Sequence, residues 1–146
     1  MAKKNNLHIK YEGKIFSNNT IYTISTRNGR VMRFLSKQGK AFINDLKKEC
    51  MVATANKKDY PLKGKVRVDL VYFHKGQGCD RDNIGKGIYD AMEGVIYLDD
   101  RQVVAGETLK IKSNRNMLYI LVQPITENEI KEQADNMLGV SCNAKY

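Results

Sequence analysis

The sequence predicts an α/β (α+β) domain with one mixed β-sheet flanked by helices. Two periodicities carry this prediction. Apolar residues alternate along residues 65–73, which is the period of a strand, and recur at spacings of three and four along residues 37–55, which is the period of a helix. A further apolar run, residues 117–122, has the length of a buried strand. Because strands lie on both sides of helices in chain order, one sheet with helices packed on it is expected.

One domain is expected over residues 1–146, with a core of about 7–124 and a C-terminal helical extension over 125–146. The chain is 42% hydrophobic and 28% charged, which is the composition of a globular domain. No apolar run approaches the roughly 18 residues of a membrane span. The N-terminal residues lack the apolar stretch of a signal peptide. We therefore expect a cytoplasmic protein with no membrane partner.

The first half of the chain is predicted to hold strands at residues 7–11, 20–24 and 31–35, and a helix at 37–55. The pair Asn28-Gly29 favours a tight turn, so the second and third strands are expected to form a hairpin. Ser36 is a good N-cap for the helix. The residues expected on the buried stripe of this helix are Ala41, Phe42, Leu46, Cys50 and Ala53.

The second half is predicted to hold a strand at 65–73, a helix at about 83–92, a strand beginning at 103, a strand at 117–122 and a helix after 126. The strand at 65–73 is apolar on both faces in its second half, which is typical of a central strand. Thr126 and Glu129 form a capping-box pattern at the start of the last helix. Its expected inward residues are Ile130, Ala134 and Met137.

Charge is divided unevenly along the chain. The total is +9, but residues 1–67 hold 16 Lys/Arg and 4 Asp/Glu, a net of +12, while residues 68–146 hold 9 and 12, a net of −3. A basic half favours a polyanionic partner, with nucleic acid first and an anionic membrane surface second. The alternative is that these lysines only keep the protein soluble.

Several familiar kinds of site are excluded. The cysteines Cys50, Cys79 and Cys142 share no short spacing, which argues against a disulfide framework and a Cys-ligated zinc site. Cys79 stands beside acidic residues, and such a neighbourhood disfavours a nucleophilic thiolate. The loop at 75–78 lacks the full pattern of a phosphate-cradling loop. No small-molecule cofactor is expected.

Six acids gather within residues 80–100, namely Asp80, Asp82, Asp90, Glu93, Asp99 and Asp100. Asp80 and Asp82 point to the same side of an extended segment, and Lys86 follows Asp82 by four residues on a helix face. Carboxylates massed together stay ionised when a hard divalent cation neutralises them. A lysine beside them suits the stabilisation of charge on phosphate. A metal-dependent nuclease requires acids that bind the metal and a basic surface that binds the nucleic acid backbone, and this sequence offers both.

Structural explanations of the same residues stay open. Asp82 could be an ordinary N-cap of the following helix. Lys86 and Asp90 could be a solvent-exposed pair worth at most about 0.5 kcal/mol. Asp99 and Asp100 could form a plain turn. Each explanation is reasonable alone, but all three must coincide within 21 residues.

The pattern resembles the RusA family of Holliday-junction resolvases, which are crossover-junction endodeoxyribonucleases. The resemblance covers roughly residues 15–123. It is carried by Asp80-x-Asp82-Asn83-x-x-Lys86, Tyr89-Asp90-Ala91 and Tyr97-Leu98-Asp99-Asp100-x-Gln102-Val103-Val104, with Ser17-Asn18-Asn19 and Ser36-x-x-Gly39-x-Ala41-Phe42 upstream.

The resemblance implies a small homodimeric α/β enzyme, bacterial or phage-encoded, that uses Mg²⁺, or Mn²⁺ as a substitute, and cuts four-way DNA junctions by paired symmetric cuts in recombination and repair. On this chain the implied metal ligands are Asp80, Asp82 and Asp100, and the implied catalytic lysine is Lys86. Asn83, Asp90 and Asp99 are implied as supporting residues. A two-fold dimer suits a junction, because it offers two identical sites for two symmetric cuts.

Six basic residues are the candidates for contacts with the DNA backbone: Lys14, Arg27, Arg30, Arg33, Lys37 and Lys40. Three features depart from the family pattern. Residues 76–79 carry no arginine cluster, the segment between Asp90 and Asp99 is slightly short, which affects how Asp100 reaches the site, and residues 126–146 are not matched. Two alternatives remain, a nuclease for other branched DNA and a non-catalytic basic junction-binding protein.

Overall fold

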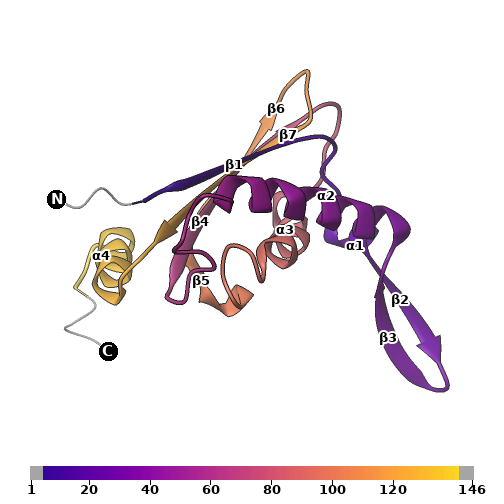
Figure 1. The fold of residues 1–146 in the computed structure, drawn as a ribbon, viewed down its shortest axis with the longest axis horizontal. Helices are drawn as coiled ribbons and strands as arrows, with labels where there is room; N and C mark the ends of the chain where they lie inside the picture. The colour runs from indigo at the N-terminus through magenta and orange to yellow at the C-terminus, as the bar shows by residue number, and fades with distance from the viewer. Residues whose placement is uncertain (1–4, 142–146) are drawn as a thin grey trace.

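A computed structural model describes residues 5–141, and Cys142 lies outside the described residues. A mixed five-stranded sheet carries two helices on one face, and a two-stranded hairpin projects from the body (Figure 1). The predicted α+β architecture is confirmed. The elements are β1 Leu7–Glu12, α1 Asn18–Ile21, β2 Tyr22–Arg27, β3 Arg30–Leu35, α2 Lys37–Thr54, β4 Val66–His74, η1 Arg81–Asn83, α3 Gly85–Met92, η2 Asp100–Gln102, β5 Val103–Ala105, β6 Thr108–Lys112, β7 Met117–Pro124 and α4 Glu127–Leu138.

Strand β4 is the central strand, as its two apolar faces predicted. The sheet order is β1-β7-β4-β5, and β6 also pairs with β4. β7 runs antiparallel to both β1 and β4, whereas β5 and β6 run parallel to β4. The sheet is therefore mixed, and β6 forms its edge beside the second half of β4.

The core lies between one face of the sheet and the helices α2 and α3. Val66, Val68, Leu70 and Tyr72 of β4 point into it, as their alternation predicted. The helix residues that meet them are Phe42, Leu46, Cys50, Ile84, Ile88, Ala91 and Met92. Burial raises the pKa of the Cys50 thiol to about 12, so this cysteine is an inert core residue.

The buried stripe of α2 differs from the prediction at one position. Ala41 is exposed, and Gly39 is buried in its place. A Cβ on Gly39 would lie 2.3 Å from the carbonyl oxygen of Ile21. The helix therefore crosses α1 at a point where only a glycine lets the two backbones approach this closely.

The predicted hairpin is present, and it forms a second, two-stranded sheet that we call the β2–β3 arm. Asn28 and Gly29 both have positive φ, 52° and 73°, as a two-residue hairpin turn requires. The predicted strand at 20–24 is wrong at its start. Ser17 caps a helical turn by accepting a hydrogen bond from the Thr20 amide, so the strand begins only at Tyr22.

The C-terminal helix α4 begins with the predicted capping box of Thr126 and Glu129. Its predicted inward residue Met137 is instead 88% exposed. α4 lies against the sheet face opposite to α2 and α3, where Gln133 accepts a hydrogen bond from Arg67 at 3.0 Å. None of the helices over residues 5–141 is both long and apolar enough to cross a membrane.

Strand β6 was not predicted. Leu109 and Ile111 do alternate with polar residues, but the segment is only five residues long and all of its residues but Thr108 are exposed, so β6 does not bury an apolar face as β4 does. Its ladder with β4 holds it in place, from Leu70↔Thr108 to His74↔Lys112.

Candidate active site

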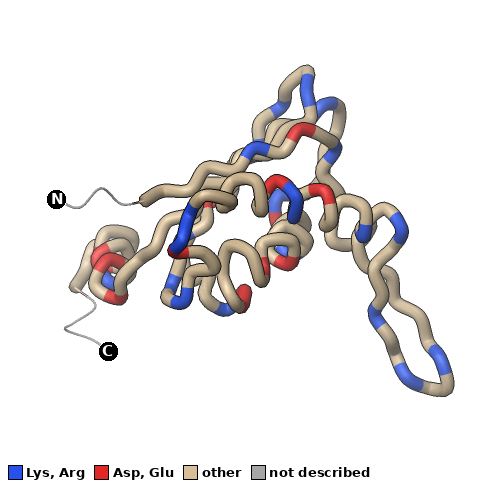
Figure 2. Tube along the Cα trace, in the orientation of Figure 1, with Lys and Arg blue, Asp and Glu red and all other residues tan. Residues whose placement is uncertain are grey.

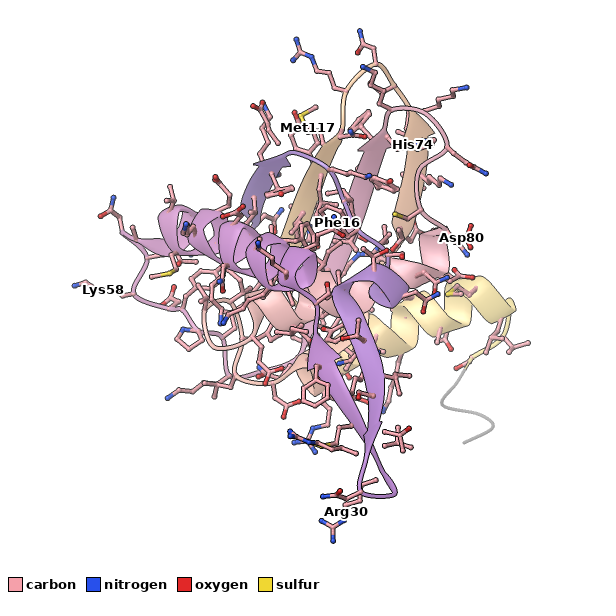
Figure 3. The ribbon with its side chains drawn as sticks, turned by 90° about the vertical axis from the view of Figure 1, so that its right-hand side faces the viewer. Phe16, Arg30, Lys58, His74, Asp80 and Met117 are labelled. Atoms are coloured by element: carbon pink, nitrogen blue, oxygen red, sulfur yellow. The ribbon has the colours of Figure 1, made fainter. Side chains whose placement is uncertain are left out.

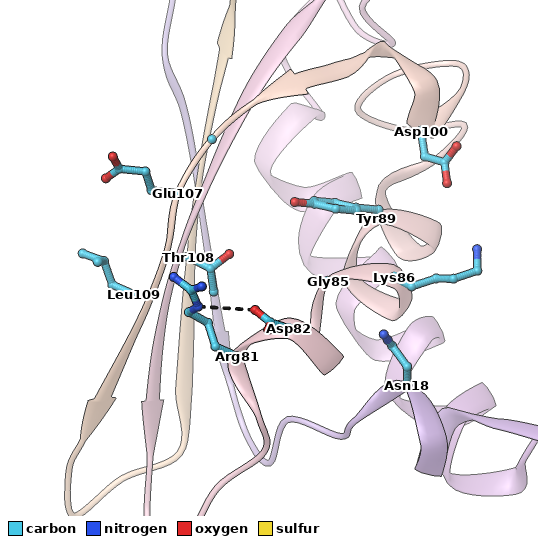
Figure 4. A pocket seen from close by; sticks show the side chains of 11 residues that line it. Asn18, Arg81, Asp82, Gly85, Lys86, Tyr89, Asp100, Glu107, Thr108 and Leu109 are labelled. Atoms are coloured by element: carbon cyan, nitrogen blue, oxygen red, sulfur yellow. Dashed lines mark ion pairs between the residues drawn. The ribbon is translucent and has the colours of Figure 1, made fainter. Parts of the chain in front are cut away.

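A cleft of about 820 Å³ opens where η1, α3, η2 and the start of β6 meet (Figure 4). Asp82 of η1, Lys86 of α3 and Asp100 of η2 all line it. The sequence-predicted residues Asp82, Lys86 and Asp100 are thus brought together from three short elements. Asn18, Arg81, Tyr89 and Thr108 complete most of the wall.

Asp82 does not cap a helix. The residue preceding η1 is Asp80 and the residue preceding α3 is Ile84, and neither makes a side-chain capping hydrogen bond. The Asp82 side chain is 87% exposed, and its Oδ1 lies 3.5 Å from Nε of Arg81. The interpretation of Asp82 as an ordinary N-cap is therefore wrong, and its carboxylate faces the solvent-filled cleft.

Lys86 is held by a chain of contacts that reaches the arm. Its Nζ lies 3.2 Å from Oδ1 of Asp90, and Tyr22 at the base of the arm donates a hydrogen bond to Oδ2 of the same carboxylate. The Arg33 guanidinium lies 4.4 Å from the centre of the Tyr22 ring. Burial, and next the hydrogen bond to Asp90, raise the pKa of Tyr22, so the phenol stays a donor at neutral pH. The Lys86–Asp90 pair is therefore no isolated surface ion pair.

A second group of acids lies at the end of α3. Asp90, Glu93 and Asp100 each offer a carboxylate oxygen, and these oxygens all lie within 4.8 Å of one another. Sequence reasoning counted Glu93 among the acids but gave it no role. The sequence did contain a signal that groups Glu93 with Asp90. Glu93 follows Asp90 by three residues at the end of a helix, and residues at this spacing share a face.

Asp99 and Asp100 are neighbours in the sequence, but the fold gives them different roles. The Asp99 carboxylate accepts a hydrogen bond from the Arg101 amide at 2.8 Å and pairs with the Arg101 guanidinium, also at 2.8 Å. The Arg101 side chain, followed by its amide, lowers the pKa of Asp99 to about 2. Asp99 forms a reciprocal capping box with Gln102. It thus builds the turn, and Asp100 is the acid that lines the cleft.

Asp80 and Asn83 flank the cleft without lining it. The Asn83 amide donates to the Asp80 carbonyl at 3.0 Å, which closes the short helical turn η1. Among the acids proposed from the sequence as metal ligands, the fold brings Asp82 and Asp100 to one cleft and leaves Asp80 just outside it.

The basic residues proposed for DNA contacts fall in two places (Figure 2). Arg27, Arg30 and Arg33 lie on the arm, and Lys37 and Lys40 lie at the start of the adjoining helix α2. Lys14 lines a second pocket together with Lys75 of the loop after β4 and Gln38 of α2.

The donors at the cleft suit a hard divalent cation. Carboxylate oxygens are the ligands that Mg²⁺ and Mn²⁺ prefer, and the cleft and its neighbouring acid group supply several within a small volume. The thiol nearest in sequence, Cys79, points elsewhere and donates to the Ile15 carbonyl at 3.3 Å. The chemistry of the site is therefore that of oxygen ligands with one amine beside them.

Comparison with known families gives one match. The model described as Endodeoxyribonuclease RusA covers residues 17–123 of this chain. The matched segment holds the arm, both core helices and all the residues of the cleft, and it ends before α4. No curated protein matches the chain.

Proposed function

Because this chain belongs to the endodeoxyribonuclease RusA family, and is therefore an endonuclease of Holliday junctions, we propose that it needs a divalent cation and cuts four-way junctions in symmetric pairs. The observation that carries the proposal is the cleft itself. Asp82, Lys86 and Asp100 come from three separate elements and line one opening. Packing for stability alone gives no reason to gather two acids and a lysine at one exposed cleft.

We assign the cation to Asp82 and Asp100, with Asp80 added from the adjoining turn. Mg²⁺ is the proposed metal, with Mn²⁺ as a substitute. When bound, such a cation polarises a phosphoryl oxygen and lowers the pKa of water. Asp90 and Glu93 each offer a carboxylate oxygen within 4.8 Å of one from Asp100, which makes the surroundings of Asp100 strongly acidic.

Lys86 is proposed as the residue that stabilises the transition state. Cutting a phosphodiester adds negative charge to the phosphate oxygens, and an ammonium group fixed beside them offsets that charge. The amine must stay in place while it acts. Asp90 holds the Lys86 amine at 3.2 Å, and Tyr22 in turn holds Asp90.

A homodimer is proposed because a junction has two strands to cut symmetrically. Two copies related by a two-fold axis present two identical clefts. The basic arm and the start of α2 are the proposed contacts with the DNA backbone. We place this reaction in recombination and repair, in the cytoplasm of a bacterium or in cells that carry a phage.

The test is cleavage of a labelled mobile four-way junction beside linear duplex and fork DNA, with EDTA, Mg²⁺ or Mn²⁺. Wild-type protein is compared with Asp82→Asn and with Asp59→Asn, which loses the same charge in an exposed loop. We expect paired junction cuts with either metal, none with EDTA, none with Asp82→Asn, and wild-type cutting with Asp59→Asn. Junction binding by Asp82→Asn should be unchanged or tighter, because a negative charge next to DNA is removed.

Mixtures of wild-type and excess Asp82→Asn protein test the dimer in the same assay. A mixed dimer has one working cleft, so single nicks should replace paired cuts. Preferential cutting of the fork would favour the nuclease for other branched DNA. Tight junction binding without cutting under either metal would overturn the enzyme and leave a junction-binding protein.

A further inference from the structure

Five cations gather at the end of the sheet away from the arm, and we call them the distal basic surface: Lys14, Lys75, Lys110, Lys112 and Arg115. Backbone and side-chain contacts tie their segments together. Lys112 pairs with His74 in the β4–β6 ladder, and the amide of Ser113 donates to the His74 carbonyl at 2.8 Å. The Lys75 amide donates to Oδ1 of Asn116 at 2.8 Å.

Lys14 joins this surface through a pocket of about 420 Å³ that it lines together with Lys75 and Asn116. Three segments that are distant in sequence therefore bring positive charge to one place. They are the segment after β1, the loop after β4, and β6 with the turn that follows it. Only Lys14 of the five was a candidate from the sequence.

The charges of the distal basic surface are not paired with acids at salt-bridge distance within the described residues. Glu12, an acid of the neighbouring strand β1, is bound to Lys10 at 2.9 Å. Uncompensated like charges on neighbouring segments repel each other, and a bound polyanion removes that cost.

Strand β6 connects this surface to the cleft. Thr108 and Leu109 at its start line the cleft, and Lys112 is its last residue. At about 3.3 Å per residue, the strand covers about 13 Å between Thr108 and Lys112, which is the rise of roughly four base pairs of duplex. Lys110 and Lys112 are both exposed on this edge strand.

The cleft lies between two basic regions. Figure 3 shows Asp80 between Arg30 of the arm, at one end, and His74 and Met117 at the other end of the molecule. Figures 1 and 2 show the same order, with the arm at the bottom and the turns that carry Lys and Arg at the top. A duplex that leaves the cleft away from the arm would pass along β6.

We propose that the distal basic surface binds the phosphates of a DNA arm on the side of the cleft away from the β2–β3 arm. This inference rests on the proposed function. DNA is favoured over a lipid surface because the cations continue directly from a nuclease cleft. In addition, a lipid surface would be bound by apolar and basic side chains on the same face. The exposed Leu109 and Ile111 point to one face of β6, whereas Lys110 and Lys112 point to the other.

The test compares a Lys110→Ala/Lys112→Ala/Arg115→Ala variant with wild type in EDTA, by measuring the Kd for a four-way junction between about 50 and 200 mM salt. Each phosphate contact contributes about 0.9 to the slope of log K against log salt. We expect the slope to fall by about 2 to 3. The matched control Lys57→Ala/Lys58→Ala/Lys63→Ala loses three exposed charges from the loop after α2, and its slope should stay within about 0.5 of wild type.

A second variant, Lys110→Arg/Lys112→Arg/Arg115→Lys, keeps the charge and should retain the wild-type slope. With metal and saturating enzyme, the control variant Lys57→Ala/Lys58→Ala/Lys63→Ala should cut at the wild-type rate, since its substituted residues lie outside the cleft lining and outside the distal basic surface. Equal slopes for the two alanine variants would overturn the proposal. The proposal would also be overturned if the Lys110→Ala/Lys112→Ala/Arg115→Ala variant lost binding to phosphatidylserine vesicles while its junction binding stayed unchanged.

The outcomes separate this inference from the proposed function. If wild type binds the junction but does not cut it, and the slope still falls in the first variant, the enzyme is overturned and the surface is supported. If wild type cuts the junction and the slopes are equal, the surface alone is overturned. Absence of junction binding by wild type overturns both.

Discussion

Tyr22 is the residue at which the arm and the cleft are joined. It is the first residue of β2, and its hydroxyl donates a hydrogen bond to Asp90. The guanidinium carbon of Arg33 of β3 lies 4.4 Å from the centre of its ring. A hydrogen bond to a charged acceptor contributes about 1.5–3 kcal/mol. The position of Lys86 therefore depends on a residue that belongs to the β2–β3 arm.

Replacing Tyr22 with Phe should reduce cleavage more than binding. The Asp90 carboxylate loses one donor, and Lys86 then loses its fixed place beside the phosphate. We expect kcat to fall by roughly tenfold, about 1.4 kcal/mol in barrier, with KM changed less than about twofold. The measurement is steady-state cleavage of the junction.

Tyr60→Phe is the control for Tyr22→Phe, because Tyr60 is a half-buried tyrosine in the loop after α2 and does not line the cleft. It should leave both constants unchanged. A rise in KM for Tyr22→Phe with an unchanged kcat would contradict the positioning role and indicate a contact made in binding only.

At the scale of elements, the helical turn α1 is held between α2 and α3. Its Asn18 Oδ1 accepts a hydrogen bond from the Gly87 amide at 3.3 Å, and Asn18 also lines the cleft. On the other side, the Ile21 carbonyl accepts the Ser36 amide at 2.8 Å and lies against Gly39. The packing of α1 on α2 thus sets one wall of the cleft.

Gly39→Ala should destabilise the protein. Ala favours a helix interior over Gly by about 1 kcal/mol, but its Cβ would meet the Ile21 carbonyl at 2.3 Å, and overpacking of this kind costs about 1–3 kcal/mol. The clash involves backbone that cannot rotate away, so we expect a net loss of about 1–2 kcal/mol in the free energy of unfolding in urea.

Gly64→Ala is the matched control, because no atom lies within 4 Å of a Cβ at that position and its φ is not positive. It should change the free energy of unfolding by less than about 0.5 kcal/mol. If the two substitutions have equal effects on the free energy of unfolding, the close approach of α1 and α2 does not exclude a side chain larger than that of glycine at residue 39.

At the scale of the whole molecule, the protein carries a net charge of +9 and yet gathers acids at one cleft. Asp90, Glu93 and Asp100 repel one another beside this cleft, and the ion pair made by Lys86 involves only Asp90. A divalent cation removes this repulsion in the folded state and has no such site in the unfolded chain.

Mn²⁺ should therefore raise the Tm, and EDTA should reverse the effect. A ligand at about 100 times its Kd adds about 2.7 kcal/mol of stability, which corresponds to about 5–10 °C for a domain of this size. The measurement is thermal unfolding followed by circular dichroism. In Asp100→Asn the Mn²⁺ shift should be lost, and in EDTA this variant should be at least as stable as wild type. An equal Mn²⁺ shift in both proteins would place the cation elsewhere.

The sequence alone determined most of the elements that local rules control. Local rules depend on neighbours within a few residues. They gave the alternation in β4, the helical stripe of α2, the caps at Ser36 and Thr126 and the turn at Asn28-Gly29, and the structure confirms these except for Ala41 in the stripe. The acid motif and its lysine were also visible, because they form a spaced pattern along the chain.

Only the tertiary structure decided which side chains meet. Tyr22 contacts Asp90 across 68 positions in the chain, and the distal basic surface takes Lys75, Lys110, Lys112 and Arg115 from the half of the sequence whose net charge is −3. The strand β6 that carries two of these cations is only five residues long, and its alternating apolar residues Leu109 and Ile111 are exposed. The physical reason is that local periodicity fixes how an element is built, whereas the packing of elements on the core fixes which of their exposed residues become neighbours.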